Sequence, residues 1–250
     1  MSIASELSRL LQAKSDLATS IENKGVTVPA SATLDDYPAL VDSISGGVTP
    51  VPYDSLVSYL QGDGTAYIDT GIKASSNINF RVVVEVLSTF PSTGQAVLGS
   101  RVANNNAALT LQYYKNSSAK YWRFAFGNNQ ITADHAGTTG TYNVSNLDRA
   151  NVIITTGAKT LAAQATNSTF SNDLNMYLFT MNTGGSVAGL EGNAYLRIKA
   201  CMIFDSYNLV RDYVPARKNG VGYLYDKVSG QLFGNANSTG AFTYGSDVGT

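Results

Sequence analysis

Apolar positions in the first 25 residues recur at steps of four and three, which is the heptad spacing of a coiled-coil seam. The seam positions are Ile3, Leu7, Leu10, Lys14, Leu17 and Ile21. Gly25 fits a left-handed cap after the last turn, where a residue without a side chain is favoured. The pattern therefore predicts a helix over about residues 2–24.

This helix is predicted to join identical chains, because a helix of this length is marginal unless it packs on something. Leu11 widens the apolar stripe, which suits contact with more than one partner helix and favours a trimer. The mix of Leu and Ile does not itself decide between dimer and trimer. A helix packed on its own β domain is the alternative. The predicted oligomerisation residues are Ile3, Leu7, Leu10, Leu11, Lys14, Leu17 and Ile21.

A shorter helical pattern follows. Within residues 26–44, Asp35 or Asp36 could cap a brief helix that tolerates Pro38 in its first turn. The glycines and prolines of residues 45–52 then predict a linker. The chain is thus divided into an oligomerisation helix at 1–25, a helical attachment unit with its linker at 26–52, and a large domain at 53–250.

Beyond residue 53 the pattern changes to short strands separated by Gly and Asn turns, and no segment keeps helical periodicity over three turns. The predicted strands are 79–87, 95–100, 107–114, 120–127, 151–156, 174–179 and 195–204. The predicted fold class is mainly β: an antiparallel jelly-roll β-sandwich, preceded by a coiled-coil helix and a short helical unit.

Composition narrows the function classes. Charged residues make up 14% of the chain and the net charge is −1. The sequence therefore has no cluster of basic residues of the kind that binds nucleic acid or a membrane surface. The start lacks the basic-then-apolar pattern of an export signal, so we expect synthesis and assembly in the cytoplasm. A single cysteine, Cys201, allows no intrachain disulfide and is expected to be buried.

Two neighbouring strands suggest a binding face. In "YWRFAFG" the alternation places Trp122, Phe124 and Phe126 in the core. In "LTLQYYK" the inward residues are Leu109, Leu111 and Tyr113. If the two strands form a hairpin, the opposite side chains share one exposed face, which is our candidate glycan-binding site: Gln112, Tyr114, Tyr121 and Arg123. The alternative is an outer sheet with scattered tyrosines, or a subunit contact.

The sequence offers little catalytic chemistry, so we expect no enzymatic activity. The one histidine, His135, lies in a polar turn, and no GxSxG nucleophile motif occurs. Glycosidases use paired carboxylates, yet Glu85 stands alone in its strand and Glu191 lies in a Gly-rich turn. Asp69 and Asp205 could still converge from different strands.

Calcium is the metal to consider, since Asp and Asn oxygens hold it in many lectin-like sandwiches. Asp63, Asp69 and Asn104–Asn106 offer such oxygens, but turn formation explains these residues equally well. We therefore expect no cofactor, with calcium as the alternative.

The N-terminal segment that includes "LQAKSDLATSIENKGVTVPASATLDDYPALVDSI" resembles a segment at the start of many tailed-bacteriophage structural proteins. The match covers about residues 5–44. It is carried by Lys24-Gly25-Val26, Pro29, Leu34, Tyr37, Leu40 and Ile44. This resemblance implies a virion component, commonly a fibre or decoration protein.

The remainder, about residues 53–244, is similar to laminin-G and concanavalin-type domains of gut phages and gut bacteria. "YLQGDGTAYIDTG" and "IFDSYNLVRDYVPARKNGVGYLYDKVSGQLFGNANSTGAFT" carry that similarity. It implies two antiparallel sheets in jelly-roll order, often with a glycan-binding face. We expect Arg211, Asp212 and Arg217 to pin the closing strands through charge-assisted bonds.

Together the two resemblances imply a head or tail fibre of a gut phage with a lectin-like tip. The expected partners are further copies of the chain, other virion proteins, and host-surface or mucin glycans. The expected location is the virion surface, after synthesis in the host cytoplasm. The alternatives are a bacterial surface lectin or adhesin, which would need an export signal, and a glycan depolymerase.

Overall fold

The computed structural model describes residues 3–44, 51–87, 94–104, 106–115, 120–134, 139–157, 159–165, 168–188 and 195–248. His135, Glu191, Asn105 and most of the predicted linker lie outside these ranges. The chain divides into two compact units, Met1–Val51 and Pro52–Thr250, and each is described by itself. No helix in the described ranges is long and apolar enough to cross a membrane.

The first unit contains the helix α1 (Ile3–Glu22), the 3-10 turn η1 (Leu34–Asp36) and the short helix α2 (Tyr37–Ser43). Both predicted helices are confirmed. Gly25 caps α1 with φ +84°, in the left-handed region that favours glycine. Asp36 precedes α2, and its carboxylate accepts hydrogen bonds from the Thr33 amide (2.7 Å) and hydroxyl (2.9 Å). Pro38 lies in the first turn of α2, where its missing N–H costs nothing.

The segment after α1 folds back against the last part of that helix. Ile21, Ala32 and Tyr37 form a small buried cluster. The Tyr37 hydroxyl donates to the Lys14 carbonyl at 3.3 Å, and the Lys14 ammonium donates to the Ala32 carbonyl. The first unit therefore has a core of its own, built from both of its helical parts.

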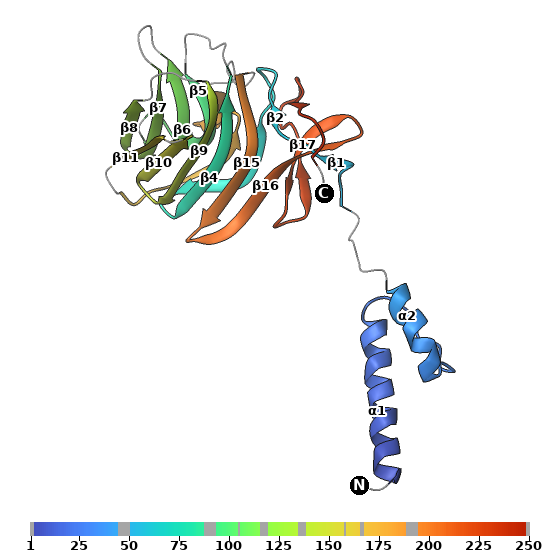
Figure 1. Cartoon of the computed structure of the whole chain (residues 1–250). Helices are drawn as coiled ribbons and strands as arrows, with labels where there is room; N and C mark the ends of the chain where they lie inside the picture. Colours follow the sequence, from blue (N-terminus) through green and yellow to red (C-terminus); the bar gives the residue numbers. More distant parts are fainter. Residues whose placement is uncertain are drawn as a thin grey trace. The chain divides into compact units, whose positions relative to one another are not determined.

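The second unit is a mainly β fold of two antiparallel sheets that pack as a sandwich, as predicted (Figure 1). Among the described residues the larger sheet has eleven strands, with the main order β11-β10-β9-β4-β15-β16-β17-β18. Its strands are β1 (Ser55–Leu56), β2 (Leu60–Gln61), β4 (Ile78–Val86), β9 (Gly140–Asp148), β10 (Asn151–Thr156), β11 (Lys159–Gln164), β15 (Leu196–Asp205), β16 (Asn208–Lys218), β17 (Val221–Asp226), β18 (Gln231–Phe233) and β19 (Thr243–Tyr244).

The smaller sheet has eight strands among the described residues, with the main order β14-β13-β5-β6-β7-β8, and β12 joins β5 to β3. Its strands are β3 (Ile68–Ser75), β5 (Gln95–Arg101), β6 (Ala108–Lys115), β7 (Lys120–Gly127), β8 (Asn129–Asp134), β12 (Ser171–Leu178), β13 (Met181–Thr183) and β14 (Ser186–Ala188). All pairs are antiparallel except β13 with β5.

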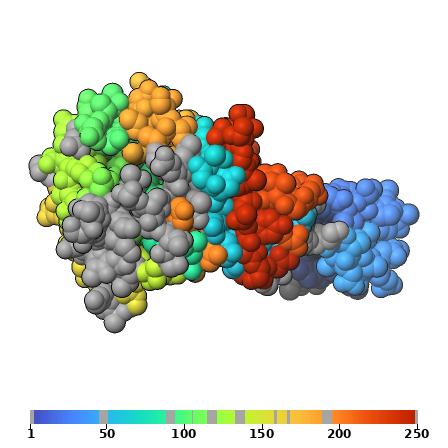
Figure 2. Space-filling model, turned by 90° about the horizontal axis from the view of Figure 1, so that it is seen from above, coloured from blue at the N-terminus to red at the C-terminus, as the bar shows by residue number. Residues whose placement is uncertain are grey.

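The two ends of the second unit lie together. β2 pairs with β19, and Val57 bridges Asp247. Figure 2 shows the red C-terminal segment against the cyan segment that begins this unit. Arg217 stabilises this pairing of the two ends, because its Nε and Nη2 each donate a hydrogen bond of 2.7 Å to the Asp247 carboxylate. That hydrogen-bonded pairing lowers the pKa of Asp247, and it agrees with the structural role expected for Arg217.

Alternate residues of the strands fill the space between the sheets, as predicted for "YWRFAFG". Trp122, Phe124 and Phe126 are buried, and the Trp122 ring lies 5.0 Å from Tyr113 and 5.2 Å from Tyr142. Leu109 and Leu111 are buried too, as expected. Cys201 is fully buried on β15, which confirms the expectation for the single cysteine.

We expect Gly99→Ala to destabilise the second unit by about 2 kcal/mol or more, because β5 and β6 meet there without room for a side chain. A Cβ on Gly99 would meet the Leu109 carbonyl oxygen at 2.1 Å and the Thr110 Cα at 2.6 Å, and φ is +133°. Gly230→Ala is the matched control, since φ is +71° there but no atom lies within 4 Å. Urea unfolding measures both. Equal losses for the two variants would contradict the packing argument.

Candidate functional site

The hairpin β6–β7 brings the four predicted binding residues to one face of the smaller sheet. Gln112 lies opposite Arg123, and Tyr114 lies opposite Tyr121. This face is opposite the core, because the alternate residues of both strands pack between the sheets. It is itself largely covered: Thr110, Gln112 and Ala125 are buried, and Tyr114, Tyr121 and Arg123 are half-buried. The two strands do form the hairpin that was considered, and it brings the four residues to one face. The full exposure expected for that face is not observed, and a role in binding stays a prediction.

Three of the four side chains form one stack. The Arg123 guanidinium carbon lies 4.1 Å from the Tyr114 ring centroid and 5.8 Å from that of Tyr121. The two rings are 5.3 Å apart, and Arg123 Nη2 donates to the Tyr121 hydroxyl at 3.4 Å. A guanidinium over a tyrosine face is attracted by the partial negative charge that the π-electrons place on that face of the neutral ring. We call Tyr114, Tyr121 and Arg123 the tyrosine–arginine stack.

Gln112 does not share the exposure expected for it. Its side chain is 5% exposed, and Nε2 approaches the Met181 Sδ at 2.9 Å. Met181 belongs to β13, which pairs with β5 on the edge opposite β6. The thioether of Met181 covers the side-chain amide of Gln112. The expectation that Gln112 contacts a ligand directly is therefore corrected by this burial.

Arg101 and Tyr177 were missed as members of this face. β5 pairs with β6 and continues the sheet, and Tyr177 of β12 lies opposite Gly99. Tyr67 packs beside Tyr177 with ring centroids 4.7 Å apart. The only sequence signal for Arg101 was its place directly after the predicted strand 95–100. It lies two residues beyond Gly99, and residues two apart in a strand share a face.

The predicted oligomerisation residues fall into two groups. Ile21 is 1% exposed and packs against Ala32 and Tyr37 of its own chain, so the expectation that it contacts another chain is corrected. Lys14 is half-buried and its ammonium donates to the Ala32 carbonyl, and its place in a seam between chains stays a prediction. The other members of the stripe are exposed, at 90% for the first and 41–60% for the rest: Ile3, Leu7, Leu10, Leu11 and Leu17.

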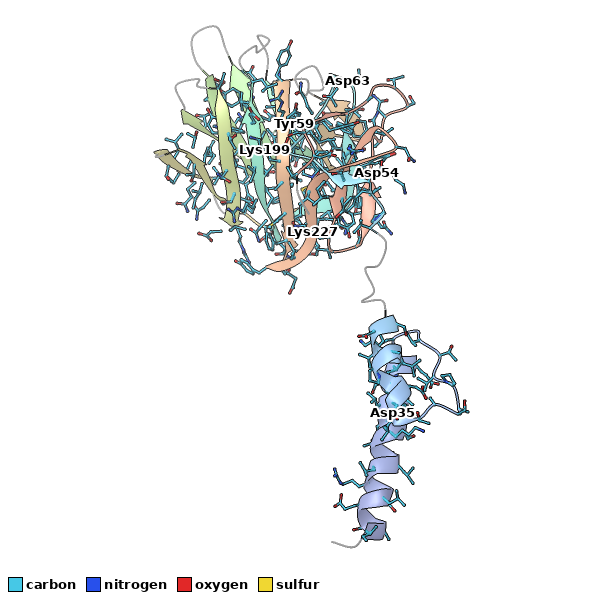
Figure 3. All side chains as sticks on the ribbon, turned by 45° about the vertical axis from the view of Figure 1, so that its right-hand side comes forward. Asp35, Asp54, Tyr59, Asp63, Lys199 and Lys227 are labelled. Carbon is cyan, nitrogen blue, oxygen red and sulfur yellow. The ribbon has the colours of Figure 1, made fainter. Side chains whose placement is uncertain are left out.

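Three of the carboxylates considered for glycoside hydrolysis lie in the described ranges, and they occupy separate places: Glu85, Asp69 and Asp205. Glu85 lies between two cations, 3.1 Å from Lys199 Nζ and 3.7 Å from Arg197 Nη1. Figure 3 labels Lys199 on the sandwich. Glu85 and Asp205 lie at opposite ends of the paired strands β4 and β15. Glu85 is opposite Arg197 at one end, and Asp205 is opposite Ile78 at the other. Asp69 lies on the other sheet.

The two aspartates considered for calcium bind groups of their own chain instead. Asp69 accepts from the Gly71 amide at 2.9 Å and from Asn175 Nδ2 at 3.2 Å. Asp63 accepts from Thr65 and Ala66 through Oδ1 and from the Ala241 amide through Oδ2 at 2.6 Å. Within the described ranges no three acidic, His or Cys side chains cluster as metal ligands do. These contacts favour the turn-forming alternative.

Asp63 gives the second unit an acid-sensitive link between its two ends (Figure 3). Burial alone would raise its pKa, but the N–H of Ala241 and the hydroxyl and N–H of Thr65 outweigh it and lower the pKa to about 2. Because the pKa of Asp63 is lower in the folded chain than in the unfolded chain, its ionised carboxylate stabilises the fold at pH values above about 3.8. This stabilisation is lost as the pH falls through about 2.

We therefore expect Asp63→Asn to reduce the loss of stability between about pH 4 and pH 2, by on the order of 1 kcal/mol after solvent screening. Urea midpoints at several pH values measure it. Asp173→Asn is the control, because that side chain is 98% exposed. An unchanged pH profile for Asp63→Asn would contradict the assignment.

No protein-family model and no curated protein matches the sequence. Among solved structures, a Bacteroides ovatus protein to which carbohydrate binding has been ascribed is similar, with a TM-score of 0.51 and 11% identity over 76% of this chain. This chain spans 60% of the length of that protein, and the likeness shows a shared β-sandwich fold. An alginate lyase from Alteromonas sp.272 matches over 55% of this chain and 76% of its own, at 10% identity. Its TM-score of 0.31 is too low to carry an argument.

Proposed function

We propose that this protein is an oligomeric fibre of a bacteriophage virion, whose helices α1 assemble copies of the chain and whose β-sandwich binds glycans on host surfaces or in mucus. The tyrosine–arginine stack on the outer face of the smaller sheet is the observation that carries the proposal. We propose a binding protein and not an enzyme.

The stack has the chemistry that sugars require. Two half-buried tyrosine rings, Tyr114 and Tyr121, lie beside a guanidinium that presents N–H donors. A sugar ring offers C–H groups to aromatic faces and hydroxyls to such donors, and specificity comes from a few polar groups among apolar ones. The Bacteroides ovatus protein, with its ascribed carbohydrate binding, supports this proposal.

The exposed stripe of α1 supports assembly with further copies of the chain. Ile3, Leu10 and Leu17 repeat at seven residues and are 41–90% exposed, with Leu7 beside them at 57%. A second copy of α1 fits this stripe, because a parallel partner presents the same residues at the same spacing. Each leucine buried in the contact contributes about 1.5–3 kcal/mol.

The virion assignment rests on the resemblance of residues 5–44 to the start of phage structural proteins. In this proposal the chain is made in the host cytoplasm, and the first unit contacts other virion proteins. The protein should then co-purify with phage particles in a density gradient. Its recovery only from the surface of bacterial cells would contradict the proposal and favour an adhesin.

Glycan binding is tested with the full-length chain on an array of host-surface and mucin glycans. We expect binding to a subset of them, and at least about tenfold weaker binding by Tyr114→Ala, since a central aromatic dominates such contacts. Tyr207→Ala is the control, because Tyr207 is 66% exposed in the turn between β15 and β16. Equal losses in both variants, or no binding at all, would overturn the proposed site.

A further inference from the structure

An open groove runs along one side of α1 in the first unit. One wall belongs to α1, and the other belongs to the segment that folds back after Gly25. The groove has a volume of about 380 Å³. Its lining includes the buried side chains of Ala32 and Tyr37 and the exposed side chains of Leu11 and Ala30. The groove is therefore open to solvent above a floor that the small core of the unit provides.

The core of the first unit is small for a separately folded part of a chain. Among the described residues of this unit, three hydrophobic side chains are buried: Ile21, Ala32 and Tyr37. Domains smaller than about 70 residues usually depend on a disulfide, a metal or a partner chain as well as on their core. The one cysteine of the protein, Cys201, belongs to the second unit and cannot form a disulfide within the first. Burial against a partner chain would supply the apolar contact that this unit needs.

The apolar stripe of α1 forms a ridge on a different side of the helix from the groove. Leu10 and Leu17 are 49% and 41% exposed, and their spacing of seven residues places them on one side. Each is followed by a residue that lines the groove, Leu11 and Ala18. Adjacent residues of an α-helix point about 100° apart. We call Leu10 and Leu17 the leucine ridge, and α1 thus carries the ridge and one wall of the groove on neighbouring sides.

The leucine ridge and the groove match in direction and length. The groove follows α1 from Leu11 to Glu22, which is roughly 16 Å at 1.5 Å per residue. The two leucines of the ridge are roughly 10 Å apart by the same rise. Small side chains on both walls, Ala18 and Ala30, leave room for larger ones. The groove can therefore take both leucines of a parallel helix.

The charges beside the two surfaces are complementary when neighbouring helices are parallel. Glu22 lines the groove in the last turn of α1. Lys24 follows Leu17 by seven residues and continues the line of the leucine ridge. Both side chains are exposed. In a parallel neighbour the ammonium of one copy reaches the level of the carboxylate of the next, and such a pair favours one orientation over the other.

We propose that the leucine ridge of one copy of the chain occupies the groove of the next copy, with the α1 helices parallel. The inference rests on the proposed assembly through α1 and adds the surface that each copy offers to its neighbour. Because the ridge and the groove are different surfaces, the contact is heterologous, and it forms a ring where the rotation between copies closes. A bundle with one central seam would instead bury the same leucines of every copy and leave Ala30 exposed.

Two variants of the full-length chain each change one of the two surfaces. Leu17→Asp places a carboxylate on the ridge, and Ala30→Asp places one in the groove. Each should assemble more than about tenfold more weakly, because a carboxylate loses its hydration in an apolar contact. Thr19→Asp and Ser31→Asp are the controls, since both residues are exposed and lie outside the ridge and the groove. Sedimentation at several concentrations measures all four.

Mixing the two impaired variants separates the proposed contact from a central seam. Leu17→Asp retains its groove and Ala30→Asp retains its ridge, so an equimolar mixture should sediment as a dimer with twice the 26.5 kDa mass of one chain. This recovery also shows that both variants fold. The uncharged pair Leu17→Gln and Ala30→Gln repeats the test, so that unfolding by a carboxylate cannot imitate a lost contact.

The outcomes distinguish this contact from the proposed assembly itself. Assembly that Ala30→Asp leaves unchanged, or mixtures of both pairs that stay monomeric, would overturn the groove contact and leave assembly through α1 standing. A wild-type chain that stays monomeric would overturn both.

Discussion

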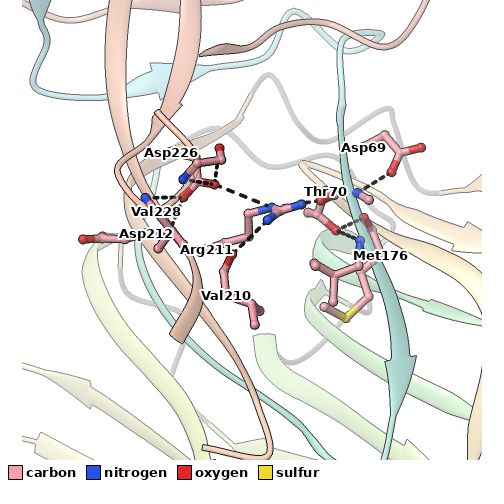
Figure 4. Close-up of polar contacts among 11 residues, drawn as sticks. Asp69, Thr70, Met176, Val210, Arg211, Asp212, Asp226 and Val228 are labelled. Carbon is pink, nitrogen blue, oxygen red and sulfur yellow. Dashed lines mark hydrogen bonds and ion pairs between the residues drawn. The ribbon is translucent and has the colours of Figure 1, made fainter. Parts of the chain in front are cut away.

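Replacing Asp226 with alanine is expected to lower the free energy of unfolding of the β-sandwich by about 3–5 kcal/mol. The Asp226 side chain is fully buried. Its oxygens accept from the amides of Asp212 (2.8 Å), Val228 (3.2 Å) and Ser229 (3.3 Å), and from the Ser229 hydroxyl at 2.7 Å (Figure 4). Arg211 Nε lies 3.7 Å away.

The loss is large because several buried donors would be left without an acceptor. Arg211 would also lose its counter-charge, although its Nε donates to the Thr70 carbonyl of the other sheet at 3.2 Å (Figure 4). Asp226 thus anchors the hairpin turn after β17 and the arginine that links the two sheets. This agrees with the structural role expected for Arg211.

Urea unfolding of Asp226→Ala measures the effect. Asp173→Ala is the matched control, since that carboxylate is 98% exposed beside Lys73 and should change stability by less than about 0.5 kcal/mol. A small loss for Asp226→Ala, similar to that of the control, would show that the turn does not depend on this carboxylate.

Leu10→Asp is expected to dissociate the assembled chain, raising the dissociation constant by more than about a hundredfold. Leu10 is 49% exposed and takes no part in the small core of the first unit, so the variant should still fold. In a bundle every copy would bring one carboxylate into the apolar seam. Burying such unpaired and mutually repelling charges is strongly unfavourable.

Sedimentation of Leu10→Asp at several concentrations measures this dissociation. Ser8→Asp is the control, because Ser8 is exposed on α1 and lies outside the apolar stripe. Assembly that survives Leu10→Asp unchanged would move the interface from α1 to another part of the chain.

Alternation along single strands was enough to predict much of the site. It placed Trp122 in the core although its indole is a familiar sugar platform, and it placed Tyr114 and Tyr121 on one face of the hairpin. It worked because residues two apart share a face whatever the rest of the fold does. A second local rule, the preference for glycine just after the last turn of a helix, predicted the left-handed Gly25 at the end of α1.

Contacts between distant segments were beyond this reasoning. Gln112 is covered by Met181, which is 69 positions later in the chain, and no local pattern indicates that. Lys14 and Ile21 have seam spacing, yet the residues that cover them follow only after Gly25. The strands β8 and β9, which contain Asn and Thr among few apolar residues, and β11, which is short and contains only small apolar residues beside Leu161, were not predicted because their apolar alternation is weak.

The mass of the full-length protein in solution decides whether α1 assembles the chain. Light scattering should give a closed oligomer of the 26.5 kDa chain, with a trimer expected, while residues 52–250 alone should scatter as a monomer. A full-length chain that stays at 26.5 kDa at the highest concentration reached would contradict the proposed fibre.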